Sequence, residues 1–209
     1  MEPITIDLSP IINLTDEQFY HLAVSQPDGI KLERTPNGEI IVVTPHGAET
    51  SNRNARLIAQ LVVWADQNED LGLVFDSDTE FKLPNGGNRS PDAAWVSRER
   101  WVALSDKERR AFPPICPDFV IELRSQAAGA EVSSATLAAP TDRLKPLQDK
   151  MQEYLNSGLR LGWLINQQDK LVEIYRQGRA KEVLQQPQTL SGEDVLPGFV
   201  LRLDKIWIN

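Results

Sequence analysis

Cysteine is nearly missing from this chain, because Cys116 is the only cysteine among its 209 residues. A lone cysteine excludes an internal disulfide framework and a cysteine-rich zinc site. It also fits a reducing compartment. We therefore expect a cytoplasmic protein in which Cys116 is an inert residue of the core or of a loop.

Long apolar runs are missing as well. No window approaches the roughly 18 consecutive apolar residues that a membrane span needs. The start, MEPITIDLSP, has no basic segment followed by an apolar run, so it does not resemble a signal peptide. These absences predict a soluble protein with no membrane partner.

Basic charge is in deficit, with 22 Lys and Arg against 30 Asp and Glu and a formal net charge of -8. Binding to a polyanion normally requires a basic surface, so this balance counts against a nucleic-acid function. Arginines are nevertheless gathered in the segments 98–101 and 106–110, and a metal ion can offset clustered carboxylates. An ordinary solvated surface explains the same arginines.

What the chain does have is enough apolar sequence for one core. Its 41% hydrophobic content and its length fit a single domain over residues 1–209, and we find neither an internal repeat nor a linker. Thr15 and the residues after it predict a capped helix that ends near Gln26. Residues 30–45 predict two strands joined at Pro36, Asn37 and Gly38, an antiparallel hairpin.

The rest of the chain alternates between helical and strand patterns. Helices are expected over 48–67 and from Asp142 to Gly158, where apolar residues recur at helical spacing. Short apolar runs predict strands at 71–77, 80–83, 92–97, 119–123, 161–166, 171–176 and 181–184. The prolines in 111–119 exclude a helix or a central strand there. The pattern is that of an α/β or α+β protein.

Two acids stand at the ends of predicted strands. Asp92 follows Pro91 and opens one strand, whereas Glu122 lies near the end of the strand 119–123. Carboxylates on neighbouring strand ends can converge, and a pair of them is the minimum that holds a hard divalent ion such as Mg²⁺. A charge between apolar neighbours is costly to bury unpaired, so something must offset Glu122. A salt bridge with Arg124 is the alternative explanation.

Lys150 lies on the apolar face of the predicted C-terminal helix. It is three residues from Leu147 and four from Tyr154, which turns it toward the sheet. A cation that faces two carboxylates is suited to stabilising the charge that develops on a phosphate, or to orienting an attacking water. A lysine that extends from the helix edge into solvent is the alternative.

These segments carry a resemblance to a known family. The stretch TPHGAETSNRNARLIAQLVVW is followed in order by NGGNRSPDAAWVSRERW, PPICPDFVIELRS and LKPLQDKMQEYLNSGLRLGWLIN. Together they resemble the Uma2 family, formerly DUF820, of the PD-(D/E)XK nuclease superfamily. The likeness extends over nearly the whole chain, and SPDAAWV and DKMQEYLNSG are its most specific parts. It implies a restriction-endonuclease-like core, in which a mixed central sheet is flanked by helices.

The resemblance also implies roles for individual residues. Asp92 and Glu122 would be the ligands of Mg²⁺ or Mn²⁺, without an organic cofactor. Arg124 occupies the usual position of the superfamily's lysine. It could hold a phosphate but would be a poor general base, and Lys150 would take over the lysine's role. Glu49 resembles an extra acid near the metal, although helix N-terminal charge complementarity explains it equally well.

The chain departs from the family pattern at two places. Residues 126–141 are inserted, and we expect them to form a flexible loop beside the site. His46 stands where a small residue is expected; it could contact phosphate, but a surface turn explains it more simply. Nucleic-acid contact is expected from Arg124, Arg98 and Trp101, whereas Trp64 and Trp163 fall in apolar runs that indicate the core.

The leading hypothesis is a metal-dependent DNA endonuclease. Its rival is a catalytically inactive module on the nuclease scaffold, which binds DNA or serves protein assembly. The acidic balance and Arg124 favour the rival. A toxin-like nuclease restrained by a partner is neither supported nor excluded. Apolar residues near the end of the chain, Ile206, Trp207 and Ile208, could contribute to a homodimer.

Overall fold

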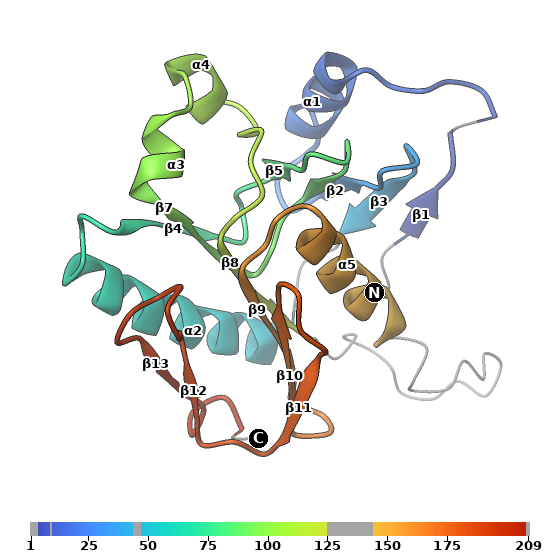
Figure 1. Ribbon diagram of the computed structural model, residues 1–209. Helices are drawn as coiled ribbons and strands as arrows, with labels where there is room; N and C mark the ends of the chain where they lie inside the picture. The colour runs from blue at the N-terminus through green and yellow to red at the C-terminus, as the bar shows by residue number, and fades with distance from the viewer. Residues whose placement is uncertain (1–3, 9, 44–46, 125–143, 208–209) are drawn as a thin grey trace, which may run out of the picture.

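A mixed sheet forms the centre of the protein (Figure 1). The computed structural model describes residues 4–8, 10–43, 47–124 and 144–207. The strands of this central sheet lie in the order β11-β10-β9-β8-β7-β4. β8 and β9 are parallel and the other neighbours are antiparallel. Their bounds are β4 Gly72–Asp76, β7 Ala93–Ser97, β8 Phe119–Leu123, β9 Leu161–Asn166, β10 Leu171–Arg176 and β11 Glu182–Gln185.

A smaller antiparallel sheet lies beside it, in the order β1-β3-β2-β6-β5. Its members are β1 Ile4–Ile6, β2 Lys31–Arg34, β3 Ile40–Val43, β5 Phe81–Lys82 and β6 Asn88–Arg89. β2 and β3 are the predicted hairpin. Gly38 has a φ of +90° in the connecting turn, a backbone conformation that residues other than glycine rarely adopt.

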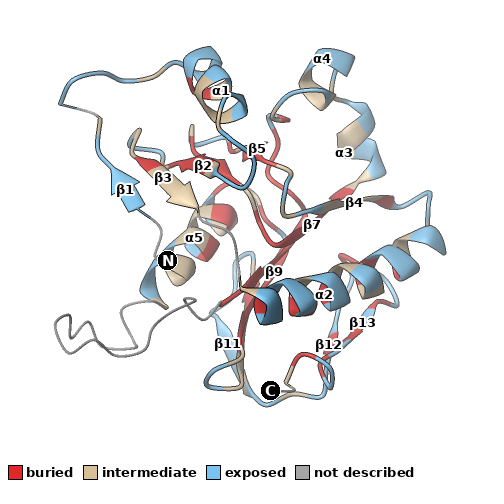
Figure 2. Cartoon of the chain, turned by 180° about the vertical axis from the view of Figure 1, so that it is seen from behind, coloured by how far each residue is buried: buried red, intermediate tan, exposed pale blue. Residues whose placement is uncertain are grey.

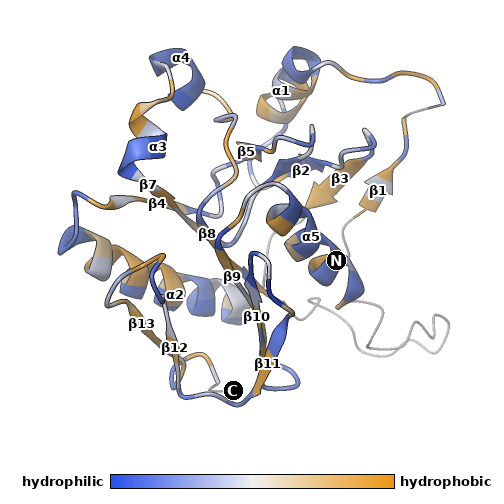
Figure 3. Ribbon diagram, viewed as in Figure 1, coloured by the Kyte–Doolittle hydropathy of each residue, from blue (hydrophilic) through white to orange (hydrophobic). Residues whose placement is uncertain are grey.

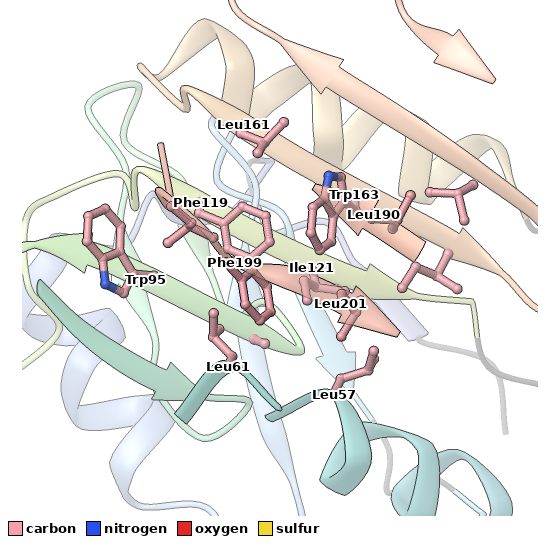
Figure 4. Packing of buried hydrophobic residues seen from close by; sticks show 14 of the residues in the cluster. Leu57, Leu61, Trp95, Phe119, Ile121, Leu161, Trp163, Leu190, Phe199 and Leu201 are labelled. Carbon is pink, nitrogen blue, oxygen red and sulfur yellow. The ribbon is translucent and has the colours of Figure 1, made fainter. Parts of the chain in front are cut away.

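One face of the central sheet is covered by helix α2 (Ala48–Asp66) and by a ribbon of β12 (Thr189–Ser191) and β13 (Val200–Arg202). Figure 4 shows the core between these layers, where Leu57 and Leu61 of α2 meet Ile121, Phe199 and the Trp163 ring. Trp163 and Phe199 stack with ring centroids 6.1 Å apart. Trp64 and Trp163 are core residues, as predicted.

Helix α5 (Lys145–Asn156) covers the other face, between the two sheets. Met151 and Tyr154 pack against Val120 of β8 and Phe81 of β5. Figure 3 shows hydrophobic and hydrophilic residues alternating along α5, as expected of a helix with one buried side. α5 begins at Lys145 instead of Asp142, which lies outside the described residues, because Pro146 belongs in a first turn.

The remaining helices complete the outer layer. α1 (Asp16–Val24) begins with a capping box between Thr15 and Gln18 and buries Phe19 on the smaller sheet. α3 (Arg98–Val102) and α4 (Asp106–Arg109) follow β7. No helix within the described ranges is long and apolar enough to cross a membrane.

The C-terminal segment corrects one expectation. Ile206 is fully buried, because it packs into the core between α2 and the β12–β13 ribbon, and the Trp207 indole donates to the Pro187 carbonyl at 2.8 Å. Ile206 is therefore not an exposed residue that a dimer could use, whereas Trp207 is half-buried. Ile208, His46 and the segment 126–141 lie outside the described residues. β1, which was not predicted, is apolar yet exposed (Figures 2 and 3).

Candidate active site

Asp92 lies at the end of an inner strand of the central sheet, directly before β7. β7 and β8 pair Ala93 with Ile121, and one further step in this register places Asp92 opposite Glu122. The Asp92 Oδ2 atom accepts a hydrogen bond from the Leu123 backbone N–H at 2.7 Å. Its Oδ1 atom accepts one from the Asn54 amide of α2 at 2.8 Å. Asp92 is thus held beside the end of β8.

Glu122 is buried on the face of β8 that meets α5. Its neighbours Ile121 and Leu123 point to the other face, into the core beneath α2. The Glu122 Oε1 atom lies 2.9 Å from the Lys150 ammonium and accepts a hydrogen bond from the Tyr154 hydroxyl at 3.1 Å. Among the described residues, none donates a hydrogen bond to the Oε2 atom, so this oxygen is available to a further ligand.

The electrostatic environment of Glu122 disfavours its negative charge. Burial, with the negative charges of Asp92 and Glu33, raises the pKa of Glu122 to about 7, although the Lys150 charge opposes the change. A cation bound beside Glu122 would stabilise its negative charge.

Lys150 is almost enclosed, with 12% of its side chain exposed. Its ammonium lies 2.8 Å from Glu33 Oε1, 2.9 Å from Glu122 Oε1 and 3.0 Å from the Ser90 carbonyl. Burial disfavours its charge, but the Glu122 and Glu33 carboxylates outweigh burial and raise the pKa of Lys150 above its ordinary value. Lys150 therefore stays protonated, and the predicted orientation toward the sheet is the one that the structure has.

Glu33 of β2 is a residue that the sequence did not reveal. It is 4% exposed, and both of its oxygens are engaged by cations. Arg89 donates to Oε2 at 3.0 Å, and the Ser90 backbone N–H and Lys150 donate to Oε1. Burial raises the pKa of Glu33, but the Lys150 and Arg89 charges outweigh burial and hold it below its ordinary value.

Arg89 connects this network to a second residue of α5. Its guanidinium also donates to Glu153 Oε2, at 2.9 and 2.5 Å, and Glu153 lies on α5 three residues after Lys150. Glu33, Arg89, Glu153 and Lys150 form what we call the ion-pair ring: three ion pairs join the four side chains, and the backbone of α5 between Lys150 and Glu153 closes it. The formal charges of its two carboxylates and two cations cancel. Because the ring is neutral as a whole, Lys150 does not fully offset Glu122 as well, in agreement with the raised pKa of Glu122.

Arg124 and Glu49 lie apart from these contacts. The Arg124 guanidinium donates to Asn166 at 3.2 Å and to Asp169 at 3.0 Å, at the turn between β9 and β10. Glu49 lies in the first turn of α2 with 75% of its side chain exposed. Throughout the described ranges, no group of three or more His, Cys, Asp or Glu side chains is arranged to hold a metal ion, so Glu49 does not join Asp92 and Glu122.

Arg98 and Trp101 are not brought to the acids either. Arg98 follows β7 at the end opposite to Asp92 and donates to the Glu69 carbonyl at 3.1 and 2.8 Å. The Trp101 ring packs on Phe75 with centroids 4.9 Å apart. Both residues make contacts within the chain at the far end of the sheet.

The donor set suits a small divalent cation. Mg²⁺ is commonly held by one or two carboxylates while it keeps several waters and binds phosphate oxygens. Asp92 and Glu122 supply two carboxylates, and Glu122 Oε2 is available. Beside them the Asn54 Oδ1 atom is buried and finds no hydrogen-bond partner in the described part of the chain. Mg²⁺ or Mn²⁺ fits these residues.

Comparison with known proteins identifies the fold and the family of this chain. A solved structure titled "putative nuclease belonging to DUF820 from Anabaena variabilis" superposes with a TM-score of 0.66 and 16% sequence identity, covering 93% of this chain and 97% of that chain. At this identity the likeness shows the fold alone. No curated protein matches the chain. The model of the Uma2 family, described as "Putative restriction endonuclease", matches residues 16–204. This match covers most of the chain, and the protein therefore belongs to the Uma2 family.

Proposed function

We propose that this protein is a metal-dependent endonuclease that hydrolyses phosphodiester bonds in DNA. The observation that carries the proposal is that Asp92 and Glu122 lie at adjacent strand ends, close enough for the Asp92 charge to raise the pKa of Glu122. The Lys150 ammonium lies 2.9 Å from Glu122. The description of the family as restriction endonucleases supports the class of reaction and the substrate.

Asp92 and Glu122 would hold the Mg²⁺ or Mn²⁺ ion. When bound, such an ion polarises a phosphoryl oxygen and makes water a better nucleophile at neutral pH. The protein's own contribution is to fix the two carboxylates. Asn54 and the Leu123 N–H hold Asp92, and Lys150 and Tyr154 hold one oxygen of Glu122 and leave the other available.

The two cations near this site have different tasks. Lys150 stays protonated beside Glu122, so it acts by charge and hydrogen bonding instead of accepting a proton. Arg124 is a guanidinium and therefore a poor base. Its Nη1 atom donates to Asn166 and Asp169 and so lies at the β9–β10 turn. We place Arg124 at the border of the site.

Three further expectations belong to this proposal. Location in the cytoplasm is proposed because Cys116 is the only cysteine. A homodimer is proposed from the family resemblance alone. Contact with DNA through Arg98 or Trp101 would require the duplex to extend to the far end of the central sheet, where these residues lie.

Cleavage assays test the proposal directly. Purified protein is incubated with plasmid and with short duplexes in Mg²⁺, in Mn²⁺ and in EDTA, and we expect cleavage only with a metal. Asp92→Asn and Glu122→Gln should abolish cleavage, since each removes a charged ligand. Asp118→Asn is the matched control, because Asp118 is a buried carboxylate at the other end of β8 that bonds the Ser97 N–H and Arg100.

The rival function is a noncatalytic DNA-binding or assembly module. The net charge of -8 and the absence of a lysine at position 124 favour it. Calorimetric titration with Mn²⁺ separates the two, because a purely structural Asp92–Glu122–Lys150 cluster would bind no ion. If the wild type cuts no nucleic acid and binds no Mn²⁺, while Asp92→Asn changes only stability, the endonuclease proposal is wrong.

A further inference from the structure

The smaller sheet contributes a side chain to the candidate active site. Glu33 stands in the middle of β2, and its carboxylate lies between Arg89 of β6 and Lys150 of α5. A carboxylate that is 4% exposed is costly to bury, and Glu33 has three donors: Arg89, the Ser90 backbone N–H and Lys150. The contacts of Glu33 lead toward Glu122.

Lys150 links Glu33 to Glu122. Lys150 donates hydrogen bonds to Glu33 at 2.8 Å and to the Ser90 carbonyl at 3.0 Å, and its ammonium forms an ion pair with Glu122 at 2.9 Å. These three contacts together fix the position of the ammonium. Without Glu33, the only carboxylate left to Lys150 would be Glu122, and Lys150 could shift to cover both of its oxygens.

Glu33 is itself held from behind. Arg89 binds its second oxygen at 3.0 Å, and Arg89 is anchored by Glu153, one helical turn from Lys150 on α5. The ion-pair ring therefore fixes Lys150 from two directions, through its own helix and through the smaller sheet. Such a closed network keeps long side chains in one conformation.

We propose that Glu33 is a positioning residue: it holds the Lys150 ammonium on one oxygen of Glu122 and so keeps the other oxygen available for the divalent ion. This inference rests on the proposed function. According to this proposal, the β2–β3 hairpin supplies a residue that positions Lys150 in the site.

The test combines metal affinity with catalysis. Glu33→Gln keeps the size of the side chain and removes the charge, whereas Glu33→Asp keeps the charge and withdraws it by one methylene. For each variant we would measure the Mn²⁺ dissociation constant by calorimetry without DNA, and kcat and KM for cleavage. On the order of a 10- to 100-fold loss in Mn²⁺ affinity and in kcat is expected, with KM little changed, as for other residues that orient metal ligands. If Glu33→Gln does not fold, Glu33→Asp carries the same comparison.

A double-variant cycle shows whether Glu33 acts through Lys150. In a Lys150→Met background, the effect of Glu33→Gln on Mn²⁺ affinity should shrink to within about twofold, because coupled residues are not additive. Glu173→Gln is the matched control. Glu173 is also a buried glutamate that bonds a lysine and a residue of α5, Lys181 and Gln148, but it does not touch Lys150.

The outcomes separate the two proposals. If the wild type binds Mn²⁺ and cleaves, while Glu33→Gln and Glu33→Asp match it or lose no more than Glu173→Gln, the positioning role is wrong and the endonuclease proposal stands. Additive losses in the Lys150→Met background would also overturn it. A wild type that neither binds Mn²⁺ nor cleaves would overturn both.

Discussion

Replacing Glu80 with glutamine should stabilise the protein at neutral pH. Glu80 directly precedes β5 and is 7% exposed, and its Oε1 atom has no hydrogen-bond partner in the described ranges. Burial and the Glu33 charge raise the pKa of Glu80 to about 9, although Arg34, Lys150 and Arg89 oppose the change. The folded protein therefore keeps Glu80 protonated at neutral pH, and glutamine imitates that neutral form.

The size of the effect follows from proton linkage. In the unfolded chain Glu80 has its ordinary pKa of 4.5. Between this pH and about 9, the folded state holds a proton that the unfolded state has released. The free energy of unfolding therefore falls with rising pH, by about 1.4 kcal/mol per unit. By pH 7 the free energy of unfolding of the wild type has fallen by about 3 kcal/mol. The Glu80→Gln variant has no group to titrate at this position, so its free energy of unfolding should not show this decrease.

Urea unfolding of both proteins at pH 4.5, 7 and 8.5 measures this difference. The variant and the wild type should have nearly equal unfolding free energies at pH 4.5, and the advantage of the variant should grow as the pH rises. Glu69→Gln, at an exposed position, is the control and should show no such trend. If Glu80→Gln is less stable than the wild type at pH 7, or if the difference does not depend on pH, Glu80 is ionised in the folded state and the reasoning is refuted.

Three further outcomes follow from the contacts. Arg124→Lys should lower the free energy of unfolding by about 1–3 kcal/mol in urea, because it disrupts the bonds to Asn166 and Asp169. Its Mn²⁺ affinity should stay unchanged in calorimetry, and a loss would place Arg124 inside the site. Asn54→Ala removes a donor to Asp92 and should weaken Mn²⁺ binding by about 10-fold, whereas unchanged affinity would show that this bond orients nothing. Burial raises the pKa of Cys116 to about 12, so iodoacetamide should label it in urea but not in the native protein, as mass spectrometry would show.

Much of the fold could be predicted because its elements follow simple periodicities. The apolar spacing of α2 and the capping box at Thr15 predicted two helices, and short apolar runs predicted the strands of the central sheet. The position of Lys150 between Leu147 and Tyr154 indicated the side of α5 that it occupies. Such rules work where one face of an element is buried and the other is solvated.

Glu33 could not be found in this way, because β2 is buried on both faces. Leu32 and Arg34 lie on the α1 side, and Glu33 lies on the α5 side, so neighbouring positions are buried alike and the alternation of apolar and polar residues is lost. Its partner is also distant in sequence, in a different layer of the molecule. The role of a buried charge in a short strand can be inferred only when the residues of the layer packed against it are known.

The same dependence on long-range partners limits what could be said of Arg124. Sequence position placed it two residues after Glu122, on the same side of β8. Its actual partners, Asn166 and Asp169, come from a turn that follows the neighbouring parallel strand. Because parallel strands are joined by long connections, no local pattern could reveal this pairing.

The dependence of the ion-pair ring on α5 has a consequence for biosynthesis. Glu33, Asp92 and Glu122 all leave the ribosome before Lys150 does, because translation runs from the N-terminus. The Glu122 carboxylate, whose cationic partner is Lys150, must stay hydrated until α5 has been made, so the two sheets cannot close around it earlier. A nascent chain therefore has the acids but not the completed cluster, and whatever chemistry the cluster performs begins only after α5 has emerged and packed.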